Sequence, residues 1–156
     1  MVGLPGRRER LTQDPTRTAE FGFPHTPLRR RLVEAILRGE KTATAGLLVD
    51  LERDGEAMAV PGERQVVVDA NEQPVAVIEI TEVAVRRMAD VDLDFARDEG
   101  EGFETVAAWR NAHERFFGSY LDEIRAGMSD PHRQLTDDTL VVCERFRLVE
   151  RLPALP

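Results

Sequence analysis

The long alternating run at residues 75–85 constrains the fold more than any other feature of the sequence. Its odd positions, beginning with Val75, face one way, whereas Ala76, Ile78 and Ile80 face the other. Apolar side chains repeated with a period of two are typical of a strand that packs on a core. We therefore predict a long β-strand here.

Further strands are predicted on both sides of this run. A Val-rich strand is predicted at residues 65–69, followed by a turn around Asn71, and a last strand is predicted at residues 140–152. Residues 41–49, rich in Thr, Ala, Leu and Val, are also expected to be extended. Because these strands do not alternate regularly with helices, the pattern favours an α+β fold, with helices packed on a small mixed β-barrel or sheet.

Three segments carry helical signals. Thr26 followed by Pro27 is typical of a helix start, and Gly39 offers a stop after the apolar positions that recur between them. A short amphipathic helix is predicted at residues 92–99. The clearest helix is predicted at residues 105–124, where a broad apolar face includes several aromatic side chains.

The chain is predicted to hold one main domain. Its 156 residues suffice for one core but not for two ordinary domains. Residues 1–20 contain prolines and glycines without periodicity and are expected to be a flexible lead-in, whereas residues 21–152 show no linker and no internal repeat. The acidic and polar residues 50–59 are expected to form a surface loop that could close over a pocket.

The charge of the chain excludes one class of partner. Its net charge of −8 argues against a protein that binds long nucleic acids in bulk, because that affinity comes from many contacts of Lys and Arg with phosphates. Residues 1–31 are an exception, since they hold seven Arg and only three acidic residues. Only a small basic footprint is therefore expected to be available for RNA.

The sequence shows no membrane, secretory or metal-binding signal. No apolar run approaches the roughly 20 residues of a membrane helix, and the N-terminus has no apolar signal segment. Cys143, the single cysteine, is expected to be an inert buried thiol, and the three histidines lack zinc spacing. Glycine-rich phosphate loops and the common hydrolase motifs are also absent. We therefore expect a cytoplasmic protein without a metal or another cofactor.

Lys41 is exceptional in the composition. Of the 21 basic residues, 20 are Arg and only Lys41 is Lys. A lysine amine can lose its proton when it is desolvated, which Arg cannot do, so this position is interpreted as functional. A neutral amine in residues 39–44, between a predicted helix and a predicted strand, could take the proton of a hydroxyl that attacks a carbonyl. The alternative is an ordinary helix end followed by a solvated lysine.

Other residues permit both a functional and a structural interpretation. Glu99 and Glu101 lie in a glycine-flanked acidic bend, and they could act as general acids or orient Lys41, or belong to a solvated loop. His113 and Trp109, on the apolar helix face, could contact a substrate or a stacked base, or simply fill the core. Arg145 could meet a phosphate or pair with an acidic residue.

These segments together resemble the ASCH superfamily, and in particular a bacterial subgroup of it. The signature Gly39-x-Lys41-x-x-Thr44 after an amphipathic helix carries the resemblance, which extends over residues 21–152. Other matching segments are residues 60–62, 75–83, 95–102 and 142–146, and the pattern Trp109-Arg110-x-x-His113-x-x-Phe116-Phe117. ASCH domains are similar to the PUA fold, a β-barrel with flanking helices that is associated with RNA and nucleosides.

The resemblance implies a catalytic site. Some ASCH proteins resemble metal-free amidohydrolases that remove acyl groups from the exocyclic amine of acylated cytidines, whereas others resemble single-strand endoribonucleases or RNA-binding modules. The lysine and threonine of the amidohydrolases fall on Lys41 and Thr44, and their glutamate is best matched by Glu99. The family often carries an arginine two residues after the threonine, where this chain has Gly46. Arg145 could replace that arginine from another strand.

These inferences give one leading hypothesis and one alternative. The first is an amidohydrolase for N4-acylated cytidine-type nucleosides, with Thr44 as nucleophile, Lys41 as general base and Glu99 to orient the lysine or protonate the leaving amine. The residues expected to bind the substrate are Glu101, Trp109, His113 and Arg145. The alternative is an ASCH module that binds or cleaves single-stranded RNA, with Lys41 on a phosphate. The expected partner is accordingly a nucleoside-type molecule or a short single-stranded RNA.

Overall fold

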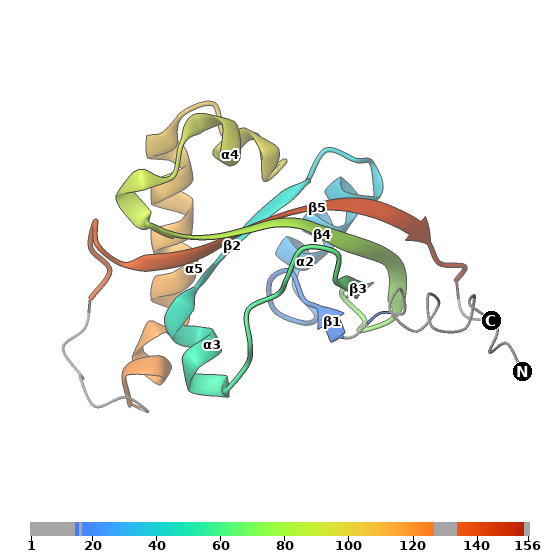
Figure 1. The fold of residues 1–156 in the computed structure, drawn as a ribbon, viewed down its shortest axis with the longest axis horizontal. Helices are drawn as coiled ribbons and strands as arrows, with labels where there is room; N and C mark the ends of the chain where they lie inside the picture. The colour runs from blue at the N-terminus through green and yellow to red at the C-terminus, as the bar shows by residue number, and fades with distance from the viewer. Residues whose placement is uncertain (1–14, 16, 127–133, 155–156) are drawn as a thin grey trace, which may run out of the picture.

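The chain folds around one five-stranded sheet (Figure 1). A computed structural model describes residues 15, 17–126 and 134–154. The strands are β1 (Arg17–Ala19), β2 (Ala43–Leu47), β3 (Arg64–Val68), β4 (Pro74–Arg87) and β5 (Leu140–Arg151). Their order in the sheet is β1-β3-β4-β5-β2, and every neighbouring pair is antiparallel except β1 and β3.

The long strand predicted from the alternating run is the centre of this sheet. β4 pairs with β3 on one side and with β5 on the other. The predicted hairpin between β3 and β4 is confirmed, and the Asp69 carboxylate closes its turn by accepting the N–H groups of Asn71 (2.9 Å) and Gln73 (3.0 Å). Helices and a mixed sheet in one chain confirm the α+β class.

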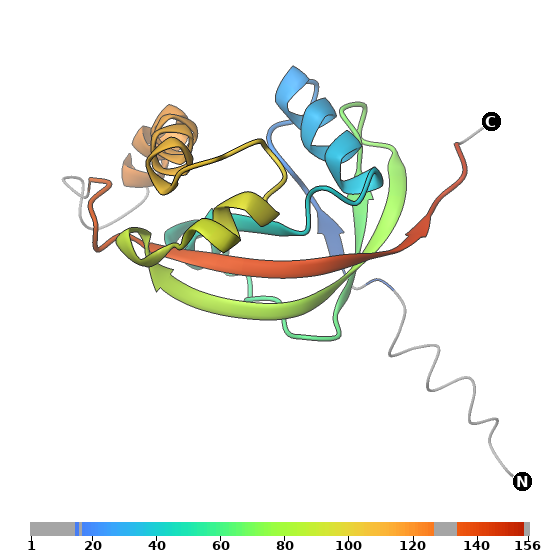
Figure 2. The ribbon, with the colours of Figure 1, turned by 90° about the horizontal axis from the view of Figure 1, so that it is seen from above.

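The sheet is strongly curved but is not a closed barrel (Figure 2). Among the described strands, β1 and β2 lie at the two edges and do not pair with each other. The expected small barrel is therefore corrected to an open, curved sheet.

A bulge at Thr81 changes which side chains of β4 face the core. Ile80 and Glu82 pair with consecutive residues of β5, so Thr81 has no partner residue there. An extra residue in one strand reverses the alternation of side chains beyond it. Val83 consequently packs toward the same cluster as Ile80, although the sequence pattern places the two on opposite faces.

The three predicted helices are present as α2 (Pro27–Leu37), α4 (Leu93–Asp98) and α5 (Val106–Ala126). Oγ1 of Thr26 accepts the N–H of Arg29 at 3.2 Å and starts α2. Asp92 starts α4 in the same way by accepting the N–H of Phe95 at 2.8 Å. None of the described helices is long and apolar enough to cross a membrane.

Two local expectations are corrected. Residues 48–54, expected to lead from a strand into a surface loop, form helix α3 (Leu48–Asp54), which buries Val49 and ends at Gly55 with a φ of 66°. β1 belongs to the segment expected to be flexible, yet it pairs with β3 and buries Ala19. Residues 1–14 and 16 of that segment lie outside the described residues.

Two apolar clusters fill the space between the sheet and its helices. One joins Ile36 of α2 to Ile78 of β4, and the other joins Trp109 of α5 to Val141 of β5. In Figures 1 and 2, α2 and the α4–α5 pair lie side by side, with the start of β2 between them. Polar residues gather where the two clusters meet.

Candidate functional site

Lys41 is buried between the end of α2 and the start of β2. The main-chain N–H groups of Glu40 and Lys41 both donate to the carbonyl of Ala35, so the chain turns sharply after the helix. The lysine is only 2% exposed. Its Nζ donates hydrogen bonds to the carbonyl oxygens of Ala43 (2.8 Å) and Glu99 (3.1 Å). The interpretation as a solvated lysine is therefore wrong.

Two carboxylates flank this amine. Glu99 Oε1 and Glu101 Oε2 each lie 3.9 Å from Lys41 Nζ, beyond direct hydrogen-bond distance. The side chain of Glu99 is 1% exposed and that of Glu101 is 23% exposed. The polar cluster thus opens toward solvent at Glu101, and Glu99 is no member of a solvated loop.

Glu99 is held by N–H donors from two elements. It follows the last residue of α4, and its Oε1 accepts the N–H of Ala45 on β2 at 3.1 Å. Its Oε2 accepts the indole N–H of Trp109 on α5. These bonds fix the carboxylate beside Lys41 and connect α4, α5 and the edge of the sheet.

His113 completes the cluster from α5. Its Nε2 lies 3.1 Å from Glu99 Oε2, and its Nδ1 lies 2.8 Å from the carbonyl oxygen of Trp109. The imidazole stacks on the indole of Trp109 with ring centres 4.1 Å apart. Phe103 and Phe117 contact it from other directions, at 5.8 and 5.6 Å.

Gly100 allows the acidic bend to lie against the lysine. Its φ is +69°, a conformation that favours glycine. A Cβ at this position would lie 2.5 Å from the carbonyl oxygen of Glu40 and 2.6 Å from the Cα of Lys41. Because any other residue would push the two segments apart, this glycine brings Glu99 and Glu101 to the amine.

Burial and charge together set the protonation of these groups. Burial lowers the pKa of the Lys41 amine, against the opposing charges of Glu99 and Glu101. Burial also raises the pKa of the Glu101 carboxyl, although Lys41 opposes this. At His113 burial acts to lower the pKa, but the hydrogen bond and the charge of Glu99 outweigh it, so the pKa is raised. Burial thus shifts the Lys41 amine toward its neutral form, and Glu99 shifts the His113 imidazole toward its charged form.

Five of the predicted site residues therefore converge: Lys41, Glu99, Glu101, Trp109 and His113. Two of them, Trp109 and His113, are 0% and 8% exposed, and their polar atoms contact Glu99 or one another. Their position agrees with the structural interpretation, in which they fill the core, and the structure adds that they hold the Glu99 carboxylate.

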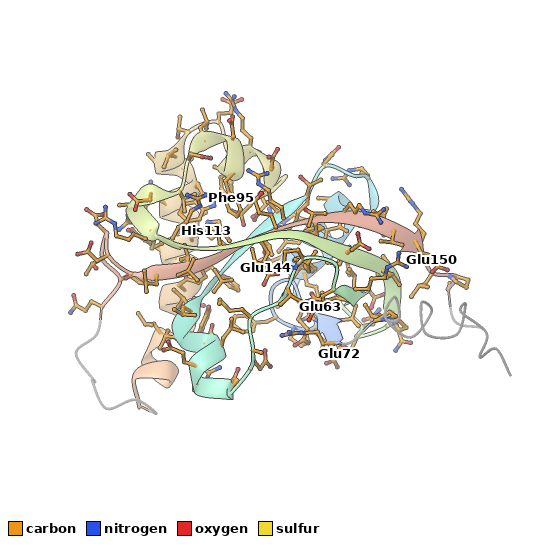
Figure 3. All side chains as sticks on the ribbon, in the orientation of Figure 1. Glu63, Glu72, Phe95, His113, Glu144 and Glu150 are labelled. Carbon is orange, nitrogen blue, oxygen red and sulfur yellow. The ribbon has the colours of Figure 1, made fainter. Side chains whose placement is uncertain are left out.

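Thr44 lies on the other face of β2. It pairs with Glu144 of β5, and strand alternation turns its side chain away from the face on which Ala43 packs. Figure 3 labels Glu144 on β5 and His113 on α5. Within the part of the chain that the structure describes, no hydrogen bond joins the Thr44 hydroxyl to Lys41. The amine does reach the adjoining peptide, since Nζ donates to the carbonyl of Ala43.

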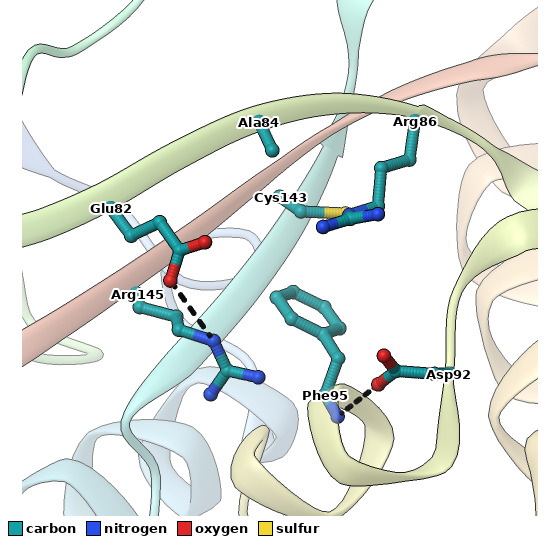
Figure 4. Close-up of a pocket in the computed structure, with 7 residues that line it drawn as sticks. All are labelled: Glu82, Ala84, Arg86, Asp92, Phe95, Cys143 and Arg145. Carbon is teal, nitrogen blue, oxygen red and sulfur yellow. Dashed lines mark hydrogen bonds and ion pairs between the residues drawn. The ribbon is translucent and has the colours of Figure 1, made fainter.

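Arg145 lines a separate cavity of about 250 Å³ beside β4, β5 and α4 (Figure 4). Its Nη1 lies 2.5 Å from Asp98, its Nε lies 3.6 Å from Glu82, and its guanidinium lies over the ring of Phe95 at 5.4 Å. Arg145 is thus held in ion pairs. Cys143 also borders this cavity, and burial raises the pKa of its thiol to about 12, in agreement with the prediction of an inert thiol.

Several contacts within this candidate site have no clear sequence signal. Phe21 places its ring 5.8 Å from Lys41 Nζ, and the N–H of Ala45 reaches Glu99 because β2 is an edge strand. Gly100 did carry a signal, since a glycine between two glutamates marks a bend. Its close approach to Lys41, however, depends on segments far apart in the sequence.

The carboxylates also have a spacing that a metal ion could bridge. One ligand atom from each of Glu99, Glu101 and His113 lies within 4.8 Å of the others. Lys41 Nζ already lies 3.9 Å from both carboxylates, so an added cation would have to share them with the lysine amine. We assign no metal ligands here, and the metal-free site remains a prediction.

Residues 20–150 match the ASCH domain. Because this match spans most of the chain, the protein belongs to the ASCH domain family, as its resemblance predicts. No curated protein matches the chain.

Two of the solved structures that are similar to this chain match most of its length. A protein from Enterococcus faecalis V583 is 28% identical, with a TM-score of 0.76, and the match covers 94% of this chain and 85% of that protein. An ASCH domain from Lactobacillus crispatus JV V101 is 31% identical, with a TM-score of 0.75, and the match covers 91% and 84%. The ASCH fold, which is similar to the PUA fold, is thereby confirmed.

Proposed function

We propose that this protein is an amidohydrolase in which the amine of Lys41 transfers the proton. The supporting observation is the number of partners around Nζ. The carbonyl oxygens of Ala43 and Glu99 accept hydrogen bonds from it at 2.8 and 3.1 Å. A neutral amine has two N–H groups for these two acceptors and keeps one lone pair. It can therefore accept a proton without breaking either bond.

The flanking carboxylates favour amide chemistry over phosphate binding at this lysine. Glu99 and Glu101 each lie 3.9 Å from Nζ, and a phosphate brought to the amine would meet their negative charge. An amide carries no net charge and avoids this repulsion. The net charge of −8 also favours an uncharged substrate over a phosphate. The alternative, in which Lys41 contacts an RNA phosphate, is therefore the weaker proposal.

The proposed substrate is a cytidine-type nucleoside acylated on its exocyclic amine. This part rests on the resemblance of the Lys41 segment to ASCH amidohydrolases. Glu101 is the member of the polar cluster that reaches solvent, so an entering substrate would contact it first. The proposal also includes a cytoplasmic location and a reaction that needs no metal.

The reaction is written with Thr44 as the nucleophile, which requires its side chain to turn from the other face of β2 toward Lys41 Nζ when the substrate binds. Its hydroxyl attacks the acyl carbonyl carbon while its proton passes to Lys41 Nζ. The bond from that carbon to the cytosine amine then breaks, and the leaving amine takes the proton from Nζ. Water next attacks the Thr44 ester and gives a proton to Nζ, the carboxylic acid leaves, and the proton returns to the Thr44 oxygen. Glu99 orients the amine through its main-chain carbonyl.

Deacylation of a small panel of acylated cytidines, followed by ultraviolet absorbance, tests this proposal. The wild-type protein should turn over at least one of them, whereas Lys41→Arg and Lys41→Met should be inactive because neither offers a titrating amine. Arg30→Gln, which removes an exposed cation from α2, is the matched control and should keep the wild-type rate. Retained deacylation by Lys41→Arg would overturn the role of the lysine.

Two further experiments test the role of Thr44 and distinguish nucleoside deacylation from RNA binding. Thr44→Val should abolish deacylation and Thr44→Ser should retain much of it. A Thr44→Val variant with full activity would assign the attack to water instead. Turnover of a neutral nucleoside should respond little to salt, whereas RNA binding should weaken steeply as salt rises. Absence of all turnover together with salt-dependent oligonucleotide binding would favour the RNA alternative.

A further inference from the structure

The hydrogen bonds of His113 determine where its ring protons lie. Nδ1 is 2.8 Å from the main-chain oxygen of Trp109, and a carbonyl oxygen only accepts, so Nδ1 carries a proton. Nε2 forms a hydrogen bond with Oε1 of Glu99 at 3.4 Å and lies 3.1 Å from Oε2 of the same carboxylate. That contact needs a second proton, which belongs either to Nε2 or to the carboxyl group.

The surroundings of Glu99 place this second proton on His113. The N–H of Ala45 donates to Oε1 at 3.1 Å, and the indole N–H of Trp109 donates to Oε2. Hydrogen bonds from N–H groups stabilise the ionised form of a carboxylate. With Glu99 ionised, Nε2 is the donor and the imidazole is a cation. Its stacking on the indole ring, 4.1 Å between centres, suits a cation.

We propose that His113 is a positioning residue that, as an imidazolium, cancels the charge of Glu99 and so leaves Lys41 free to work as a neutral amine. The catalytic meaning of this inference rests on the proposed function. The assignment of charges within the cluster does not.

The proposal solves a problem that the two carboxylates create. Glu99 and Glu101 both lie 3.9 Å from Nζ, and two uncompensated negative charges would keep a proton on the lysine. His113 offsets the first of them by direct contact. Burial weakens the second, because it raises the pKa of Glu101.

Few other titratable groups act on this histidine. Glu99 and Glu101, in the segment that follows α4, both act on His113. Lys41 Nζ lies 3.9 Å from each of these two carboxylates. The remaining ring contacts among the described residues come from the aromatic rings of Phe103, Trp109 and Phe117. The Cys143 thiol of β5 interacts electrostatically with Glu99, but burial raises the pKa of this thiol and favours its uncharged form. Arg31 of α2 also acts on Glu101. The charge balance therefore depends on His113, Glu99, Glu101, Lys41 and Arg31.

The composition of the chain allows a direct measurement. Because Lys41 is the single lysine, protein labelled with [13Cε]lysine gives one lysine resonance, and its pH titration reports the pKa of that amine. His113→Gln keeps a neutral N–H donor near Glu99 but removes the positive charge. We expect the pKa of Lys41 to be higher in this variant, by less than the roughly 1 to 3 that a directly adjacent charge causes, because His113 acts on Lys41 through Glu99. The acid limb of the deacylation rate should move to higher pH by the same amount.

Phe103→Leu is the matched control for packing. It alters a ring contact with His113 without changing a charge, so it should leave the pKa of Lys41 unchanged. An unchanged Lys41 pKa in folded His113→Gln would overturn the proposal. If that variant does not fold, the ring nitrogen resonances of wild-type His113 decide. A doubly protonated ring at pH 7 supports the proposal, and a neutral ring overturns it.

Neither resonance experiment needs a substrate, so the two proposals fail separately. If no acylated cytidine is turned over but the Lys41 pKa rises in His113→Gln, the proposed function fails and the charge assignment stands. If deacylation is found but the Lys41 pKa stays unchanged, the amidohydrolase proposal stands and the role of His113 fails.

Discussion

Replacing Gly100 by alanine should destabilise the protein more than the same replacement at Gly102. Both glycines have left-handed φ values, 69° and 84°. A Cβ at Gly100 would lie 2.5 Å from the Glu40 carbonyl oxygen and 2.6 Å from the Lys41 Cα, and these backbone atoms cannot swing aside. A Cβ at Gly102 would meet nothing within 4 Å. Gly102→Ala is therefore a matched control that carries only the cost of the backbone conformation.

The expected magnitudes follow from these two contributions. A left-handed conformation costs a non-glycine residue roughly 1–2 kcal/mol, which applies to both variants. Forcing extra atoms into packed structure adds about 1–3 kcal/mol, which applies only to Gly100→Ala. The free energy of unfolding should thus fall by about 2–5 kcal/mol for Gly100→Ala and by about 1–2 kcal/mol for Gly102→Ala.

Urea unfolding and thermal melting of the two variants beside the wild type would test this. In a chain of 156 residues, each 1 kcal/mol lowers the Tm by about 2–4 °C, so Gly100→Ala should melt about 4–20 °C below the wild type. Equal stability of the two variants would refute the close packing of the acidic bend on Lys41. The lysine resonance should also shift in Gly100→Ala, because the Glu99 carbonyl that accepts from Nζ is displaced.

Four further predictions use the same assays. Glu99→Gln removes one of the two carboxylates beside Lys41, so it should lower the pKa of that amine in the lysine titration; a rise would contradict the proposed electrostatics. Cys143, buried with a thiol pKa of about 12, should react with a thiol reagent only when the protein unfolds, and rapid labelling of the native protein would contradict its position. Folding raises the pKa of His113 above its usual 6.5, so the stabilisation by this histidine is fully present below about pH 6.5 and is lost as the pH rises through its pKa in the folded protein. Urea unfolding at several pH values should show this loss of stability in the wild type and not in His113→Gln. Thr26→Ala removes the cap of α2 and should reduce the free energy of unfolding by about 1 kcal/mol, whereas an unchanged value would argue against the cap.

The start of α2 illustrates how far local signals define the fold. Thr26 and Pro27 specify a helix start within a few residues, so no distant contact is needed to predict it. The alternation in β4 is equally local as far as Ile80. Beyond it, the bulge at Thr81 depends on pairing with β5, which lies more than 50 residues further along the chain.

Helix α3 shows why other elements could not be predicted. Its first residues are apolar and continue a Thr- and Val-containing stretch, so their local pattern fits a strand followed by a polar loop. The helix buries Val49 against the cluster that contains Leu121 of α5. A tertiary contact thus overrides local propensity, and such a contact cannot be predicted from the local sequence pattern.

Part of the candidate site could likewise be predicted from local sequence signals, and part of it could not. Lys41 could be predicted because it is the single lysine and lies on the family signature, and Glu99 lies in an acidic bend next to a glycine. The link between Glu99, Trp109 and His113 could not, since it requires α4 and α5 to meet at the edge of β2. The position of Thr44 on the opposite face likewise follows from strand register.

The place of β2 at the edge of the sheet has a consequence for aggregation. An edge strand presents unpaired N–H and C=O groups that can pair with a strand of another molecule. Here the Glu99 carboxylate takes the N–H of Ala45, and the Lys41 amine donates to the carbonyl of Ala43. The side chains proposed to perform the chemistry therefore also shield this edge. Variants that truncate them should self-associate more readily than the wild type, so a loss of activity in such variants has to be separated from a loss of monomeric protein by light scattering.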